Sequence, residues 1–529
     1  MTSCPACNSE RIKKKGTRNS RQRFKCKDCH HWFSGILNVE EILDEVRDTI
    51  EEIQEIVEEK ASKIKMIEPY LDFRKEYPNS RGIVVTSAIN NTGLNKEFFS
   101  ALQKYCEAKN FTLMVIPLKY MNPSAMNMGD DPSWPPEVQE YLMRRTYTIN
   151  GVLKVIGDCN IQATATHPLT GIDGLTDGMT TIVGHPIVQM KTLPVNPWRD
   201  PIIMHSTGSV SLKNNYSASK AGYRASYHHC FSAVVVEMDG DIFHIRQLMA
   251  DRTGGFFDLC DYYGPNGYER TERAEAIVLG DEHVAVQSGP AYMASFYGKN
   301  SMLSVLKPKF LVRHDVFDAQ SCGKHDVKNF FGRFKKFHQK TSSVMEELDL
   351  TLSHIEETTP EDCISLIANA NHTQHLDQWL NEYGDPKFDL LNAELYHNLM
   401  YRKLKDIREG NTRDSFRIYA EDVYGVSDRI SFMDDGFELH GVQLSLHGDR
   451  GPSGARGSIQ NLSRIGERVV IGHSHQPGIL GGAWQTGTLS RLDLDYAKGS
   501  PSAWLHTNCV IYSSGKRQLI NIVRGKWRP

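Results

Sequence analysis

The sequence predicts an α/β protein with several domains, and two observations indicate this fold class. Residues 81–88, 95–110 and 111–118 follow one another as a buried strand, an amphipathic helix and a second strand, which is a β-α-β unit. In the second half, apolar strands alternate with helical stretches such as residues 327–355. The chain of 529 residues is long enough for roughly two to four domains, each with its own core.

The composition is that of a soluble globular protein. Hydrophobic residues make up 40% and charged residues 24% of the chain, and the net charge is -3. No apolar run reaches the length of a membrane span, and Cys and Lys stand where a signal peptide would have its apolar core. Seven scattered cysteines suit buried thiols better than a disulfide framework. We therefore expect a cytoplasmic protein without a membrane partner.

Four cysteines near the N-terminus have the spacing of a structural zinc site. Cys4 and Cys7 form one CxxC pair, and Cys26 and Cys29 form a second pair after 18 intervening residues. A segment this short cannot fold on an apolar core alone, so a bound Zn²⁺ would supply much of the folding free energy. The alternative is a flexible tail with four reduced thiols. We predict a zinc ribbon over residues 1–36.

The region between the cysteine pairs is strongly basic. The pattern CPxC, a basic stretch ending in RQRF, CKxC and a following aromatic resembles the zinc ribbons at the N-termini of insertion-sequence transposases. This resemblance implies DNA contact, and the alternative is a ribbon that binds protein. The candidate phosphate contacts are Lys13, Lys14, Lys15, Arg18, Arg21 and Arg23.

A sharp change of charge marks a boundary near Gly35. Residues 1–36 carry nine Lys and Arg against two acids, whereas residues 37–60 carry ten acids against two bases. Apolar residues between 39 and 67 recur at alternating steps of four and three, which is a heptad pattern. The pattern predicts a helical, coiled-coil segment over 37–74. It indicates either a homo-oligomer through residues 39–67 or one amphipathic helix docked on the body of the protein.

Residues 75–265 read as one mixed α/β domain of open role. The loop after its first strand lacks a GxGxxG or Walker pattern, so we interpret it as scaffold or recognition surface. Asp158, in VIGDCN, ends a strand much as a metal ligand would, but no histidine follows it in the expected place. We therefore leave Asp158 out of the candidate site.

The second half of the chain holds the clearest functional signal. Five apolar strands each end in residues that commonly bind metals: AIVLGDEH (276–283), FLVRHDVFD (310–318), SLIANANHT (365–373), GVQLSLHGD (441–449) and RVVIGHSH (468–475). One such strand end would mean little, because a lone Asp or His usually satisfies a local hydrogen bond. In open α/β sheets this edge is where sites assemble, so five in order predict a metal site.

This series resembles the motifs DxH, GDxxD, GNH[DE], H and GHxH of the calcineurin-like metallophosphoesterases, over residues 272–515. The resemblance implies a β-sandwich flanked by helices and leaves 516–529 as a C-terminal tail. It also implies that Asp315 bridges two divalent cations. One cation would then be held by Asp281, His283 and His475, and the other by Asn371, His447 and His473. His372 is implied as the general acid that assists the leaving oxygen, and its alternative role is to orient the site.

Ligand chemistry narrows the choice of cation. Oxygen and imidazole donors without thiolate suit Mn²⁺, Fe or Zn, and we favour Mn²⁺. Two departures from the family pattern leave every ligand in place: His314 stands where a glycine is usual, and ANHT stands where GNH and an acid are usual. The glycine-rich loop 447–458 adds Arg450 and Arg456, which either clamp neighbouring phosphates or lie on a solvated turn.

The DNA-type ribbon and the metallophosphoesterase motifs together predict a metal-dependent DNase. The arrangement resembles phage-encoded metallophosphoesterases, in particular the early host-DNA-degrading DNases of T5-like phages, which would place the protein in the host cytoplasm. One alternative is a phosphatase or phosphodiesterase acting on small-molecule or protein substrates. A second alternative is a DNA-binding regulator that keeps a non-catalytic metal site.

Overall fold

The computed structural model describes residues 3–18, 21–35, 50, 54, 70–120, 132–196, 199–213, 219–270, 273–324, 329–494 and 497–529. The chain divides into two compact units, residues 1–69 and 70–529. The predicted heptads at 39–67 lie outside the described residues except for Ile50 and Gln54. Self-association through them therefore stays a prediction.

The N-terminal unit contains a small antiparallel sheet. Its strands are β1 (Ile12–Arg18), β2 (Arg21–Cys26) and β3 (Trp32–Gly35). Each CxxC pair lies at a tight turn, where Asn8 (φ 51) and His30 (φ 61) adopt the left-handed conformation. Asn8 N donates to the Cys4 carbonyl at 2.8 Å, and Cys26 N donates to the His31 carbonyl at 3.0 Å. These turns bring the two cysteine pairs together.

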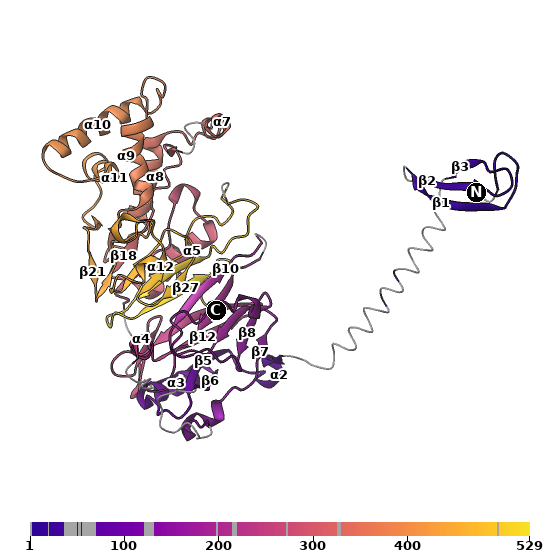
Figure 1. The fold of residues 1–529 in the computed structure, drawn as a ribbon. Coiled ribbons are helices and arrows are strands. Elements are labelled where there is room, and N and C mark those ends of the chain that lie inside the picture. The colour runs from indigo at the N-terminus through magenta and orange to yellow at the C-terminus, as the bar shows by residue number, and fades with distance from the viewer. Residues whose placement is uncertain are drawn as a thin grey trace. The chain divides into compact units, whose positions relative to one another are not determined.

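A six-stranded sheet forms one layer of the 70–529 unit (Figure 1). Four neighbouring strands are parallel: β20 (Ile430–Phe432), β19 (Ile364–Ile367), β18 (Phe310–Arg313) and β17 (Ala276–Val278). The antiparallel strands β26 (His506–Ile511) and β27 (Arg517–Ile522) complete it. The tail predicted over 516–529 is therefore wrong in its first part, because residues 517–522 form a buried edge strand.

An eleven-stranded sheet runs through the whole 70–529 unit. Its order is β21 (Glu438–Leu439), β22 (Val442–Gln443), β23 (Val469–Ile471), β25 (Ala483–Gln485), β24 (Gly478–Leu480), β10 (Gln189–Leu193), β11 (Ile202–Ser206), β9 (Thr180–Val183), β8 (Leu153–Ile156), β7 (Tyr147–Ile149) and β4 (Leu71–Asp72). β10 pairs with β24, so this sheet joins the predicted 75–265 and 272–515 regions. The predicted boundary at residue 74 falls inside α2 (Phe73–Glu76), directly after β4.

The predicted β-α-β unit is present as β5 (Gly82–Ile89), α3 (Lys96–Lys109) and β6 (Phe111–Leu118). The Asn95 side chain accepts from Phe98 N at the start of α3, and Asn110 ends the helix in the left-handed conformation. β12 (Ser232–Asp239) and β13 (Ile242–Met249) complete a four-stranded sheet in the order β13-β12-β5-β6. A three-stranded sheet of β14 (Phe256–Asp258), β15 (Asp261–Gly264) and β16 (Gly267–Arg270) follows.

One apolar core joins the three larger sheets. It contains Ile83 of β5, Ile182 of β9, Val312 of β18 and Trp484 of β25, all buried. The 70–529 unit is thus mixed α/β, as predicted, with packed sheets and flanking helices. Among the described residues, no helix is long and apolar enough to cross a membrane.

Helices cover the six-stranded sheet and extend beyond it. α5 (Gly289–Phe296) and α6 (Met302–Leu306) pack on one of its faces. The others are α7 (Phe330–Gln339), α8 (Val344–Glu357), α9 (Asn371–Gln378), α10 (Ala393–Arg408) and α11 (Ser415–Tyr419). Figure 1 shows α8 to α11 gathered at one end of the unit, where α8, α9, α10 and α11 share a core.

Candidate metal centre

The candidate ligands lie where the sequence predicts them, at the carboxyl ends of strands. Asp281 and His283 follow β17, Asp315 follows β18, and Asn371 begins α9 after β19. His447 follows β22, and His473 and His475 follow β23. β17, β18 and β19 belong to the six-stranded sheet, whereas β22 and β23 belong to the eleven-stranded sheet. The site therefore assembles between the two sheets.

Six of the seven candidate ligands form two compact groups of side chains. The first group is Asp281, His283 and His475, and the second is Asp315, His447 and His473. Within the first, His283 Nε2 lies 3.0 Å from His475 Nε2, and His475 Nε2 lies 3.4 Å from Asp281 Oδ2. Within the second, His447 Nε2 lies 2.9 Å from Asp315 Oδ2. The seventh residue, Asn371, lies beside the second group, with Oδ1 3.1 Å from His473 Nδ1.

The backbone is strained at four of these positions. His283 (φ 41), Asp315 (φ 42), His473 (φ 74) and His475 (φ 60) adopt the left-handed conformation, which is uncommon for residues other than glycine. Such strain costs on the order of 1–3 kcal/mol per residue and persists where the surrounding structure enforces it. Gly472 shows how tight the packing is, because a Cβ there would collide with Asp281 Oδ1. The fold thus holds these side chains in one place at a cost in stability.

The side chains present fit a pair of divalent cations. Among the described residues, Asp281 Oδ1, His475 Nδ1 and His447 Nδ1 are buried without a hydrogen-bond partner. Buried polar groups are normally hydrogen-bonded, so an unpartnered set of this size calls for an explanation. Carboxylate oxygen and imidazole nitrogen are donors that Mn²⁺, Fe and Zn²⁺ accept. Cations held by both groups would satisfy these atoms.

His314 occupies the place where the resemblance leads one to expect glycine. Its side chain is fully buried, and its ring lies 5.5 Å from the His447 ring, measured between centroids. Burial lowers the pKa of His314 to about 3, so the ring is neutral. The imidazole thus fills space beneath the second group without adding charge.

Sequence reasoning missed Asp318, which the structure places in the site. Its Oδ1 lies 3.0 Å from His283 Nδ1, and its backbone carbonyl accepts from His372 Nδ1 at 2.7 Å. A carboxylate behind a metal-binding histidine orients the ring and raises its basicity. The signal was available, because Asp318 is the second acid of the HDVFD motif.

Sequence reasoning also missed a buried ion-pair network under the site. Arg313 donates to both Glu282 oxygens at 3.0 and 2.9 Å, and His354 Nε2 lies 2.8 Å from Glu282 Oε2. Arg313 also donates to Ser365 Oγ at 3.0 Å and to Thr358 Oγ1 at 2.8 Å. Because Glu282 stands between two candidate ligands, the network ties the ends of β17, β18 and β19 together. No sequence pattern links His354 to these strands.

Nearby carboxylates favour the protonated forms of two of the site's histidines, His283 and His447. Burial alone would lower the pKa of His283 and His447, but Asp318 beside His283 and Asp315 beside His447 outweigh it and raise each pKa to about 9. Burial raises the pKa of Asp281 to about 7. Groups with raised pKa values hold protons at neutral pH, and cation binding must release those protons.

We therefore expect Mn²⁺ to bind more tightly as pH rises from 6.5 towards 9. Each proton released contributes up to about tenfold in affinity per pH unit. Isothermal titration calorimetry at several pH values, in buffers of different ionisation enthalpy, measures both the affinity and the proton count. An affinity that is independent of pH would contradict the raised pKa values.

A large cavity opens at the metal centre. It has a volume of about 1820 Å³ and is lined by Asp315, Asn371, His372, His473 and His475, among others. Among the described residues, the carboxylates that line it are Asp315 and Asp318, and both belong to the candidate site. The cations that line it in the described part of the chain, in contrast, come from four separate places in the sequence: Lys191, Lys335 with Lys336, Arg456 and Arg491.

The two arginines of the glycine-rich loop lie in different surroundings in the structure. Arg456 lines the cavity, as its predicted phosphate contact requires. Arg450 donates to Gln374 Oε1 of α9 at 2.7 Å, and its side chain is 69% exposed. Arg450 therefore lies on the outer side of the loop, tied to α9.

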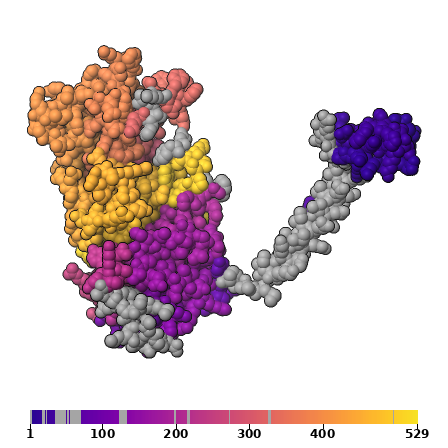
Figure 2. All heavy atoms as spheres, in the orientation of Figure 1, coloured from indigo at the N-terminus to yellow at the C-terminus, as the bar shows by residue number. Residues whose placement is uncertain are grey.

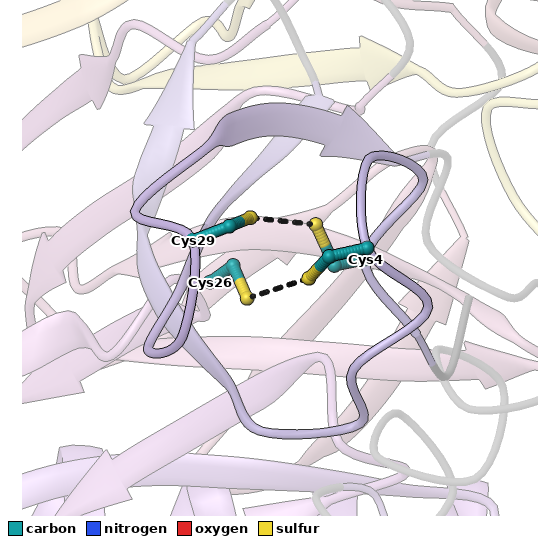
Figure 3. Close-up of side chains that lie close together, drawn as sticks. Cys4, Cys26 and Cys29 are labelled. Carbon is teal, nitrogen blue, oxygen red and sulfur yellow. Dashed lines mark hydrogen bonds between the residues drawn. The ribbon is translucent and has the colours of Figure 1, made fainter.

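The four N-terminal cysteines form a separate candidate metal site. Figure 3 shows the sulfurs of Cys4, Cys26 and Cys29 directed toward one place. Cys4 Sγ lies 3.6 Å from Cys29 Sγ, and Cys7 Sγ lies 3.6 Å from Cys26 Sγ. This separation is far too long for a disulfide but close to the about 3.8 Å between sulfurs that a tetrahedral zinc site requires. The backbone amide of Cys29 lowers the pKa of Cys26 to about 6, which favours the thiolate that binds metal.

The basic residues of the ribbon lie on its sheet. Lys13, Lys14, Lys15 and Arg21 are exposed, and Arg18 lies at the end of β1. The Arg23 guanidinium stacks over the Trp32 ring at 4.8 Å from its centroid. This geometry is compatible with phosphate contact along β1 and β2, and DNA binding by the ribbon stays a prediction.

The chain has a relative among phage proteins. It is 29% identical over 479 residues to Protein A1 of Escherichia phage T5. The aligned region covers 85% of this chain and 84% of Protein A1. The predicted relation to phage proteins is thus confirmed. No protein-family model and no solved structure matches the chain.

Proposed function

We propose that the second half of the 70–529 unit is a metal-dependent phosphodiesterase that hydrolyses DNA. The observation that carries the proposal is the pair of groups Asp281–His283–His475 and Asp315–His447–His473 at one cavity. Two divalent cations held there, with Mn²⁺ favoured, would lower the pKa of a water molecule and neutralise charge on phosphoryl oxygens.

The residues of the chain have distinct roles in this proposal. We assign to Asp315, whose Oδ2 lies 2.9 Å from His447 Nε2 and whose Oδ1 accepts from His372 N at 3.4 Å, the role of a carboxylate shared between the two cations. His372 Nδ1 is engaged by the Asp318 carbonyl, so Nε2 is the atom that can exchange a proton. We assign to His372 the transfer of a proton to the leaving oxygen.

Two features favour a polymer over a small substrate. The cavity of about 1820 Å³ exceeds the range of about 300–1,000 Å³ that is usual for small-molecule pockets. Its cationic lining suits a chain of phosphates. A phosphatase for small molecules would need neither feature. A DNA-binding regulator with a non-catalytic metal site would not need strained candidate ligands beside an open cavity.

The proposal is tested by digesting plasmid and linear DNA with the native protein, with and without Mn²⁺. We expect degradation that depends on Mn²⁺, and the size of the products distinguishes internal from terminal cleavage. Deleting residues 1–36, which belong to a separate compact unit, should slow DNA cleavage but leave hydrolysis of bis(4-nitrophenyl) phosphate unchanged. Hydrolysis of the small diester without any DNA cleavage would contradict the proposed substrate.

A further inference from the structure

The eleven-stranded sheet repeats one pattern on either side of its centre. β10 and β24 pair antiparallel at the middle, with Met190 opposite Ile479. Outwards from β10 come β11, β9, β8 and β7, paired in turn antiparallel, parallel, parallel and antiparallel. Outwards from β24 come β25, β23, β22 and β21, with the same series of directions.

The other two large sheets repeat a pattern as well. β13-β12-β5-β6 pairs in turn antiparallel, antiparallel and parallel, and β27-β26-β17-β18 pairs in the same way. The edges of the two sheets meet where Leu519 N donates to Gln247 Oε1 at 2.9 Å. Figure 2 shows the first half of the unit, in purple and magenta, in broad contact with the second, in orange and yellow.

Equivalent hydrogen bonds align the two halves residue by residue. Leu489 N donates to the Asp281 carbonyl at 2.8 Å, and Val210 N donates to the Ser87 carbonyl at 2.9 Å. The hydroxyls of Thr488 and Ser209 donate to the same two carbonyls at 2.8 and 2.9 Å. Ser87 therefore stands where Asp281 stands. The surrounding sequences agree, TGTLS at 486–490 and TGSVS at 207–211.

The Gly-His motif is repeated too. Thr486 N donates to the Ile471 carbonyl, and Thr207 N donates to the Val183 carbonyl, so Gly184-His185 corresponds to Gly472-His473. His185 is fully buried, but its Nε2 lies 3.0 Å from the Gln162 carbonyl and its Nδ1 accepts from Ile187 N. Its ring nitrogens are thus used within the fold.

At three of the other ligand positions, the first half has isoleucines, which cannot bind a cation. By the same alignment, Ile89 stands at the position of His283 and Ile187 at that of His475. In the first half Val84 of β5 pairs with Leu113 of β6, and in the second half Val278 of β17 pairs with Val312 of β18. Three residues further along each second strand stand buried Ile116 and Asp315, so Ile116 occupies the position of the proposed bridging carboxylate. Asp158 corresponds to His447, which explains why VIGDCN resembles a metal-binding strand end. An isoleucine cannot bridge cations, so this half lacks the two-metal centre.

The metal-free half still reaches the site of the other half. Because β10 adjoins β24, residues 189–192 line the cavity together with the metal ligands. His167 and Thr170, on an exposed turn, line it as well. Lys191 also lies here and pairs with Asp173.

We infer that residues 82–249 are a second copy of the catalytic fold that has lost its cations and now positions DNA at the metal centre of the other copy. The inference rests on the proposed function, since a DNA chain extends beyond the bond being cut and needs a surface for its flanking nucleotides. The wall formed by His167, Thr170 and residues 189–192 supplies polar and cationic groups to that chain.

The test introduces negative charge into this wall in the full-length protein. We expect the double variant His167→Glu, Lys191→Glu to raise KM for DNA about tenfold, with kcat nearly unchanged, and to flatten the salt dependence by about one unit of slope per lost phosphate contact. Hydrolysis of bis(4-nitrophenyl) phosphate should be unaffected. Lys220→Glu, an exposed residue of α4 (Lys220–His228) away from the cavity lining, is the matched control.

Three results would overturn the inference. The first is a double variant whose KM for DNA equals that of Lys220→Glu. The second is a parallel loss of diester hydrolysis, which would place the two residues in the metal centre itself. The third is more than two bound Mn²⁺ in residues 70–529 by metal analysis. If the native protein cleaves the small diester but no DNA, the proposed substrate fails, and the inference fails with it.

Discussion

Replacing Asp315 with asparagine is expected to abolish hydrolysis and weaken binding of both cations. Its carboxylate contacts His447 and accepts from the backbone amide of His372, and the proposal gives it the role of bridging the two cations. Asparagine keeps the volume and tolerates the φ of 42 at this position, so the fold should survive. We expect a loss of at least about 10³-fold in kcat/KM, or about 4 kcal/mol of transition-state stabilisation.

The measurement combines initial rates on bis(4-nitrophenyl) phosphate and on DNA with Mn²⁺ content per chain. Asp318→Asn serves as the comparison because Asp318 pairs with His283, and its candidate ligand group, with His283 and His372, does not include Asp315. Loss of such an orienting carboxylate costs about 10–100-fold in affinity or activity. An Asp315→Asn protein that binds two Mn²⁺ and hydrolyses the diester at the native rate would refute the two-cation site.

Replacing Arg313 with methionine is expected to have the largest effect on stability. Arg313 and Glu282 are both fully buried, and their ion pair is closed by His354, Ser365 and Thr358. Burial would raise the pKa of Glu282, but the Arg313 charge outweighs it and holds that pKa below its usual value. Removing Arg313 leaves a buried carboxylate without its main partner, which costs about 3–5 kcal/mol.

Urea unfolding measures this change in the free energy of unfolding. Lys309→Met is the control: Lys309 precedes the same strand and pairs with Glu275 at 2.8 Å, but its side chain is 48% exposed. Exposed ion pairs contribute roughly 0–1 kcal/mol, so the control should unfold nearly as the native protein does. Equal free energies of unfolding for the two variants would show that the Arg313 network contributes little to stability.

Several elements follow from the sequence because their signals are local. The apolar runs at 81–88 and 111–118 become β5 and β6, since β-branched and apolar residues form buried strands. The helical stretch at 327–355 is divided into α7 and α8, because Lys340 ends α7 in the left-handed conformation and Ser343 caps α8. The sequence predicts a tail where residues 517–522 form β27, since a short strand after a turn is recognisable only by its pairing with β26.

From the sequence follow the types of candidate ligand and their order along the chain, from Asp281 to His475, and the two CxxC pairs. Only the folded chain reveals that Asp318 pairs with His283, that Glu282, Arg313 and His354 form one buried network, and that the strand pairing within residues 82–249 repeats that of the second half. The physical reason is that strand order and register depend on contacts between distant residues, such as Met190 and Ile479. Hydrophobic periodicity says which residues form a strand, but not which strand lies beside it.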